Sequence, residues 1–148
     1  MNERMNVFQL EPKPLEVMLE MEKYIASTQI NHTLRELIKI RASQINKCAY
    51  CLEMHTADAR KAGETEQRIY ALPAWEESPH FTNEEKAALA LTEEITRIQE
   101  QGVKEETFQQ MRKYFTDHQI AQVIIIINQI NSWNRINVTT RQVYTSPH

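Results

Sequence analysis

Glycine occurs only twice in the 148 residues of this chain, at Gly63 and Gly102, and this scarcity limits the folds that are open to it. Tight β-hairpin turns need residues with positive φ, a conformation that glycine adopts most readily. The chain also lacks segments in which apolar and polar residues alternate as they do in half-buried strands. We therefore predict an all-α fold, and the length fits one compact helical domain over residues 1–148.

Helical periodicity and capping residues divide the chain into a series of expected helices. Residues 1–14 contain two prolines and are predicted to form an extended N-terminal arm. The second helix is expected to start with Thr33 as its cap and Glu36 at the reciprocal capping-box position, and Thr82 with Glu85 forms another such pair. The expected helices cover approximately residues 15–30, 33–46, 48–62, 64–71, 82–99, 104–114 and 117–133.

Five consecutive β-branched residues, Val123 to Ile127, would form a strand if intrinsic propensity alone decided. No partner strand is expected elsewhere, so we place this run in the last helix, with Asp117 as its cap. Because isoleucines occupy every face, this helix is predicted to be buried all round. Large apolar surfaces are rarely left in water, so we expect part of it to contact another subunit and the chain to form a homo-oligomer.

The charge balance argues against several kinds of partner. The formal net charge is −3 and the pI is about 6.0, with scattered Lys and Arg, so no nucleic-acid partner is expected. No apolar run approaches the roughly 18 residues of a membrane span, and no apolar signal-peptide region follows the first residues. We therefore expect a cytoplasmic protein, in which a permanent structural disulfide would be unusual.

The two cysteines of the chain, Cys48 and Cys51, are separated by two residues, and His55 follows one helical turn later. Such a pair on a helix can close a small disulfide, so one thiol can attack a substrate while the other resolves the product. Helical spacing places all three side chains on one stripe with Leu52 and Ala59, so the reactive groups are predicted to face inward. Because a base beside a thiol activates it, the pattern predicts redox chemistry.

Residue chemistry alone leaves open which thiol attacks. The start of the helix favours ionisation of Cys48, whereas His55 at i+4 favours Cys51. A carboxylate on the far nitrogen of His55 would fix its tautomer, and Glu36 is a candidate for that role. Periodicity, however, places Glu36 roughly opposite the main apolar stripe of its helix, as a capping or solvated carboxylate.

Metal binding is the main alternative for this cluster. A structural zinc site needs four ligands, and Cys48, Cys51 and His55 supply at most three, so we expect no bound metal. A thioredoxin-like protein is excluded because its C-x-x-C lies in a βαβ unit and no strands are predicted. Two other functions stay open, a non-peroxidatic redox relay or sensor and a structural metal-binding helical protein.

The cysteines lie in the segment RASQINKCAYCLEMHT, residues 41–56, which continues through ARKAGE at residues 59–64. This segment, with C-x-x-C-x-x-x-H preceded by A-S-x-x-N, resembles the core of the alkylhydroperoxidase D-like proteins of the carboxymuconolactone decarboxylase superfamily. The close match extends over residues 34–75. The resemblance implies an all-α fold that assembles as trimers or hexamers. It also implies a peroxidase without metal, haem or other cofactor, which reduces organic hydroperoxides and is recycled by a dithiol such as a lipoyl-bearing protein.

The resemblance also implies a role for each site residue. In that family the second cysteine of the motif attacks the peroxide and the first resolves the product, so Cys51 would attack and Cys48 would resolve. The histidine four residues later and the glutamate twelve residues before the first cysteine form a proton relay, and these positions are His55 and Glu36. The best-known members have a histidine immediately before the second cysteine, where this chain has Tyr50, so a difference in rate or substrate range is expected.

Overall fold

The computed structural model describes residues 2–145, and every regular element among these residues is helical. The all-α prediction is therefore confirmed. The elements are α1 (Val7–Leu10), α2 (Pro12–Ala26), α3 (His32–Ile45), α4 (Ala49–Lys61), α5 (Glu66–Ala71), the short 3₁₀ helix η1 (Leu72–Ala74), α6 (Asn83–Thr96), α7 (Ile98–Gln101), α8 (Glu105–Tyr114) and α9 (Asp117–Thr140). None of the helices in the described part of the chain is long and apolar enough to cross a membrane.

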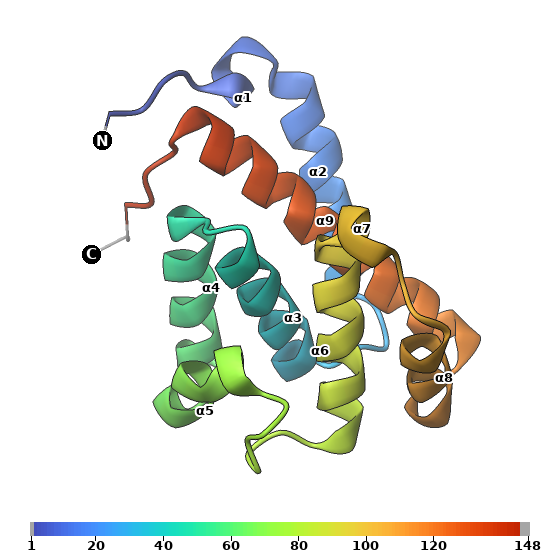
Figure 1. The fold of residues 1–148 in the computed structure, drawn as a ribbon. Coiled ribbons are helices and arrows are strands. Elements are labelled where there is room, and N and C mark those ends of the chain that lie inside the picture. The colour runs from blue at the N-terminus through green and yellow to red at the C-terminus, as the bar shows by residue number, and fades with distance from the viewer. Residues whose placement is uncertain (1, 146–148) are drawn as a thin grey trace.

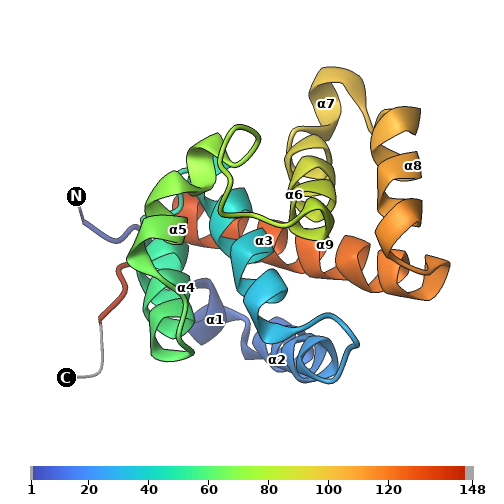
Figure 2. The same ribbon diagram turned by 90° about the horizontal axis from the view of Figure 1, so that it is seen from below.

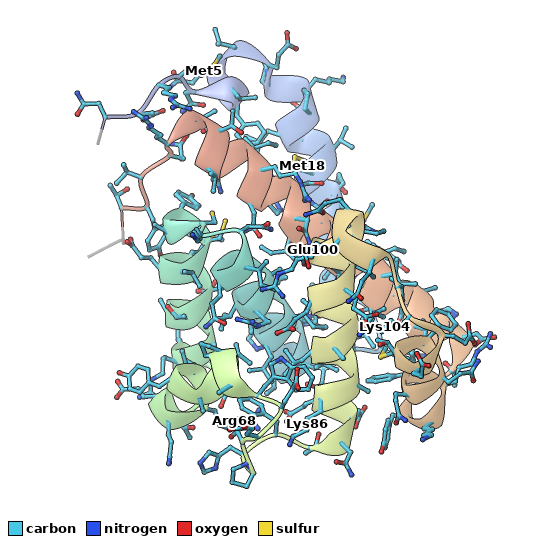
Figure 3. The ribbon with its side chains drawn as sticks, in the orientation of Figure 1. Met5, Met18, Arg68, Lys86, Glu100 and Lys104 are labelled. Atoms are coloured by element: carbon cyan, nitrogen blue, oxygen red, sulfur yellow. The ribbon has the colours of Figure 1, made fainter. Side chains whose placement is uncertain are left out.

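The longest helix, α9, runs across the molecule, and the other helices are arranged around it (Figure 1). In the view from below, α2 lies on one side of α9, and α6 and α8 lie on the other (Figure 2). Figure 3 labels Met18, which lies on α2 beside α9. There the Gln129 amide donates to the carbonyl of Met18 at 3.1 Å. The main apolar core lies between α3, α6, α8 and α9 and includes Leu34, Leu91, Met111 and Ile126.

The β-branched run from Val123 to Ile127 is helical, as predicted, although Thr116 rather than Asp117 caps α9. Three of its five residues lie in the core, whereas Ile124 and Ile125 are only half-buried. The prediction that the helix is buried all round is therefore wrong for these two. Five consecutive residues point in all directions around a helix, so some of them must face away from the core.

The predicted extended arm over residues 1–14 is wrong from Val7 onward, and residue 1 lies outside the described residues. Residues 7–10 form α1, and the Asn6 side chain caps it by accepting hydrogen bonds from the N–H groups of Phe8 and Gln9, each at 3.1 Å. Helix α2 then begins directly at Pro12. Proline is well tolerated in the first turn of a helix because the N–H groups there have no helical partner in any case. The prolines therefore start a helix instead of extending the chain.

The helix that carries Glu36 starts earlier than predicted. The Asn31 side chain accepts a hydrogen bond from the N–H of Leu34 at 2.9 Å, so Asn31 rather than Thr33 caps α3. Glu36 therefore belongs to no capping box. Its carboxylate is available for contacts with α4, which packs along α3.

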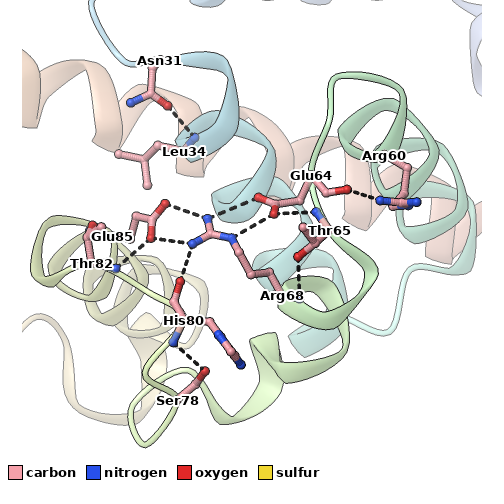
Figure 4. A network of polar contacts seen from close by, with 10 residues as sticks. All are labelled: Asn31, Leu34, Arg60, Glu64, Thr65, Arg68, Ser78, His80, Thr82 and Glu85. Atoms are coloured by element: carbon pink, nitrogen blue, oxygen red, sulfur yellow. Dashed lines mark hydrogen bonds and ion pairs between the residues drawn. The ribbon is translucent and has the colours of Figure 1, made fainter.

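Arg68 on α5 ties the segment after α4 to the start of α6 (Figure 4). Its guanidinium pairs with Glu64 at 2.9 Å and with Glu85 at 2.7 Å, and it donates to the carbonyl of His80 at 2.5 Å. Glu85 also closes the capping box with Thr82, which confirms that prediction. Bidentate pairs of this kind fix geometry as well as charge. The network therefore holds the loop between α5 and α6 and anchors the end of α4, whose first turn carries the cysteines.

Candidate active site

Both cysteines lie at the start of α4 and are buried against α9. Cys48 is the N-cap residue of α4, and its sulfur accepts a hydrogen bond from the N–H of Cys51 at 3.4 Å. In the turn before Cys48, Lys47 has a φ of 55°. The N–H of Cys48 donates to the carbonyl of Ser43 at 3.0 Å. Each cysteine is a free thiol and 1% exposed, in an apolar cluster with Ile130 of α9. The predicted inward orientation of the pair is confirmed.

Asparagines of α9 supply polar groups to this otherwise apolar cluster. The Asn137 Nδ2 donates to the sulfur of Cys51 at 3.4 Å. One turn earlier, Asn134 donates to the Ser43 hydroxyl at 3.0 Å, and its side-chain carbonyl accepts from Asn46 at 2.9 Å. Asn134 and Asn137 are both buried. A buried amide fixed by other hydrogen bonds can stabilise a negative sulfur without having to reorient.

The two thiols ionise in a defined order. A hydrogen bond from the Cys48 thiol lowers the pKa of Cys51 to about 6; burial opposes this change, while the amides of Asn137 and Asn134 and the charge of His55 reinforce it. The pKa of Cys48 is raised, because its thiol donates in that hydrogen bond and because it is buried. Cys51 is therefore the first thiolate to form, which favours one of the two alternatives that residue chemistry left open.

Glu36 and His55 form a buried pair between α3 and α4. The His55 Nδ1 lies 2.9 Å from Oε2 of Glu36, and both residues are buried. This corrects the interpretation of Glu36 as a capping or solvated carboxylate. Helix α3 is enclosed by α4, α6 and α9, so a position opposite its main apolar stripe is still buried, here against α4. The contact orients the imidazole and leaves its Nε2 as the nitrogen that can exchange a proton with a reactant.

The other oxygen of Glu36 faces a lysine and a second histidine. Its Oε1 lies 3.8 Å from Nζ of Lys39 and 3.9 Å from Nε2 of His32. Burial alone would raise the pKa of Glu36, but the hydrogen bond with His55 and the charges of His55, Lys39 and His32 together lower it. Glu36 is therefore a carboxylate at neutral pH.

A cavity of about 530 Å³ opens in front of Cys51. Cys51, His55 and Glu36 all line it, whereas Cys48 is not among its lining residues. Its volume is that of a site for a small organic molecule. The rest of the wall is largely apolar and includes Phe8, Leu15, Leu19, Tyr50, Met54 and Trp133.

Tyr50 marks the departure from the best-known alkylhydroperoxidase D-like proteins. It lines the cavity, is half-buried, and packs edge-to-face on Tyr144 with ring centroids 5.4 Å apart. Burial raises the pKa of its phenol, and the negative charge of Cys51 acts in the same direction. The phenol therefore stays protonated at neutral pH, so it cannot replace a histidine as a proton acceptor.

The sequence interpretation missed the polar residues that α9 and α3 contribute. A signal for the first was present, because Asn131, Asn134 and Asn137 recur at i, i+3 and i+6 on a helix whose other buried positions are mostly apolar. No comparable signal marks Lys39, which is buried beside Glu36. Within residues 2–145, no group of three or more His, Cys, Asp or Glu side chains is arranged to hold a metal ion.

Together, these features define an all-α protein with a buried dithiol at a helix start and a glutamate–histidine pair on the same cavity. The model of the carboxymuconolactone decarboxylase family matches residues 12–94, which is more than half of the chain. The chain therefore belongs to the carboxymuconolactone decarboxylase family.

Related proteins share most of the length of this chain. The uncharacterized protein YdfG of Bacillus subtilis (strain 168) is 50% identical over 138 residues, which cover 93% of this chain and 94% of YdfG. The crystal structure of ATU0492 from Agrobacterium tumefaciens, a protein of unknown function considered a candidate antioxidant defence protein AhpD, matches with a TM-score of 0.94 at 35% identity over 99% of this chain and 100% of ATU0492. The debrominase Bmp8 matches with a TM-score of 0.79 at 19% identity over 94% and 75% of the two chains, and this likeness concerns the fold alone.

Proposed function

We propose that this protein is a thiol-dependent peroxidase that reduces organic hydroperoxides through a dithiol/disulfide cycle of Cys48 and Cys51. One arrangement carries the proposal: the thiol of lowered pKa, Cys51, lines the cavity, Cys48 adjoins it, and the His55–Glu36 pair lines the same cavity. These groups supply a nucleophile, a resolving thiol and a proton carrier. Membership of the family and the likeness to ATU0492 support the proposal.

The proposed cycle balances as one hydroperoxide and two thiols giving one alcohol, one water and one disulfide. His55 takes the thiol proton of Cys51, the resulting thiolate attacks the distal peroxide oxygen, the O–O bond breaks, and the departing alkoxide takes that proton back from His55. Cys51 is then a sulfenic acid. Cys48 attacks its sulfur, loses its thiol proton to the leaving hydroxide, and water departs as the disulfide forms. An external dithiol restores both thiols by exchange and is itself oxidised.

The partners of this cycle belong to the proposal as well. The reductant would be a dithiol, such as that of a lipoyl-bearing protein, and the chain would work as a homo-oligomer, a trimer or a hexamer, in the cytoplasm. Apolar side chains on the outside of α1 and α2 offer surface that a neighbouring subunit could cover. They include Leu10, Val17, Met21 and Tyr24.

A steady-state assay tests the proposed function directly. Reduced protein mixed with cumene hydroperoxide is expected to lose two thiols per chain and form one disulfide, and an added dithiol should sustain turnover. Thiol titration and mass spectrometry measure the first result, and peroxide consumption measures the second. Rapid exchange with dithiols but no faster peroxide loss than with free cysteine would instead identify a redox relay.

The reaction of Cys51 with peroxide should depend on pH through its own ionisation. Because the thiolate is the nucleophile, the rate should rise roughly tenfold per pH unit below about pH 6 and level off above it. Asn137→Ala removes a donor to the thiolate and should move this midpoint to higher pH. Asn128→Ala, an exposed asparagine of the same helix, serves as the control. Stopped-flow measurement of the rate across the pH range gives the midpoint for each protein. Identical midpoints for Asn137→Ala and wild type would contradict the role of that amide.

A further inference from the structure

Three carboxylates and one ammonium group lie on the wall of the active-site cavity. Glu22 comes from α2, Glu36 and Lys39 from α3, and Asp58 from α4. Lys39 is the only lysine or arginine among the described residues that line this cavity. The cavity wall therefore carries a net negative charge even when the imidazole of His55 is protonated. The attacking thiolate of Cys51 adds a further negative charge.

Two of these carboxylates already neutralise Lys39. Its Nζ lies 3.3 Å from Oε2 of Glu22 and 3.8 Å from Oε1 of Glu36, and the residue is only 8% exposed. Glu22 is fixed in turn, because its Oε1 accepts a hydrogen bond from the indole N–H of Trp133 at 2.9 Å. Turning the ammonium group toward a substrate would break a largely buried ion pair, which is costly.

The remaining wall suits an apolar molecule. Phe8 and Trp133 pack edge-to-face with ring centroids 5.6 Å apart. Leu15, Leu19 and Met54 continue this apolar surface. The cavity is much larger than a hydrogen peroxide molecule requires, and apolar surface removed from water favours binding of a hydrocarbon or aromatic body.

We propose that this cavity accepts uncharged hydroperoxides with an apolar body and rejects those that carry a carboxylate; the inference rests on the peroxidase function proposed above. A carboxylate that entered would lose its hydration and meet the thiolate and the acidic wall, while Lys39 is already paired. Glu22 is the specificity-determining residue, because it neutralises Lys39 without contacting the reacting sulfur. The steps of the peroxidase cycle are the same for every substrate that enters.

Two substrates that share one scaffold and differ in charge test the inference, cumene hydroperoxide with a para-carboxylate and the methyl ester of that compound. Reduced wild-type protein should react with the ester at least about thirtyfold faster in a single turnover, after each rate is divided by that with free cysteine. Equal normalised rates would overturn the inference and leave the peroxidase intact. Reaction with neither substrate would overturn the proposed function.

Binding tests the same selectivity independently of turnover. The two alcohols that correspond to these peroxides cannot react, and calorimetry measures their affinity for the wild-type protein. The ester alcohol should bind at least about tenfold more tightly than the carboxylate alcohol. Equal affinities, or tighter binding of the carboxylate, would overturn the inference even if the protein proved to have no peroxidase activity.

A charge-matched pair of variants tests the role of Glu22. Glu22→Gln keeps an acceptor for Trp133 but leaves Lys39 less neutralised, so the rate with the carboxylate relative to the ester should rise about tenfold. Glu20→Gln makes the same charge change at an exposed position of α2, where the side chain pairs with Lys23, and should leave the ratio unchanged. An unchanged ratio in Glu22→Gln would contradict the assignment. Because the readout is a ratio, a general loss of rate does not affect it.

Discussion

Replacing Cys51 by serine is expected to slow the reaction with cumene hydroperoxide by about 10³-fold or more. The pKa of Cys51 is about 6, so the attacking group at neutral pH is a thiolate, whereas a serine hydroxyl stays protonated and is a poor nucleophile. Serine also cannot form a sulfenic acid. Peroxide consumption in a single turnover measures the effect. A normal rate in Cys51→Ser would show that the attacking thiol is assigned wrongly.

The matched variant Cys48→Ser separates attack from resolution. It should react once, at a rate within about tenfold of wild type, because a serine hydroxyl can still donate a hydrogen bond to the Cys51 thiolate. The reaction should then stop at a sulfenic acid on Cys51, which dimedone labelling and mass spectrometry detect. The reverse pattern, in which Cys48→Ser loses the first step, would exchange the roles of the two thiols.

Neither substitution is expected to unfold the protein. Serine is among the preferred N-cap residues, so Cys48→Ser preserves the start of α4. At position 51 a serine hydroxyl can accept the hydrogen bond that Asn137 donates to the sulfur. Circular dichroism and thermal melting close to those of wild type would therefore establish that the lost activity is chemical.

The helical fold can be predicted from the sequence because most of the features that indicate helices act over a few residues. The apolar periodicity and the Thr82–Glu85 capping box are local signals of this kind, and the scarcity of glycine in the whole chain agrees with them. The prediction of an extended N-terminal arm fails because proline has opposite effects at different positions of a helix. Pro12 disfavours a helix interior yet suits a first turn, and the Asn6 cap and the packing of α2 on α9 favour the helical alternative.

The candidate site is less predictable because three separate helices build it. His55 shares a helix with the cysteines, so spacing alone places it. Glu36 lies 19 residues away from it along the chain, and Asn137 lies 86 residues from Cys51. A helical wheel assumes one buried face, whereas residues 36–40 of α3 are all buried. The family resemblance supplies Glu36 as a candidate, but neither the resemblance nor periodicity identifies Asn137.

Glu36→Gln is expected to lower the rate of peroxide reduction by about 10²-fold at neutral pH. Glutamine has the same shape, and its carbonyl can still accept the hydrogen bond from His55 Nδ1, but its charge is absent. Without that charge, the imidazolium that passes its proton to the departing alkoxide in the proposed cycle loses its ionic partner. Initial rates of peroxide consumption at neutral pH measure the deficit.

Chemical rescue, together with thermal melting, separates a proton-positioning role from a merely structural one. Glu53→Gln makes the same charge change at an exposed position two residues after Cys51, and its rate and melting temperature should match those of wild type. His55→Ala should lose at least as much activity as Glu36→Gln, and added imidazole should restore part of it by replacing the missing proton donor. If added imidazole restored nothing to His55→Ala and Glu36→Gln melted well below wild type, Glu36 would serve to hold α3 against α4 and would have no part in moving the proton.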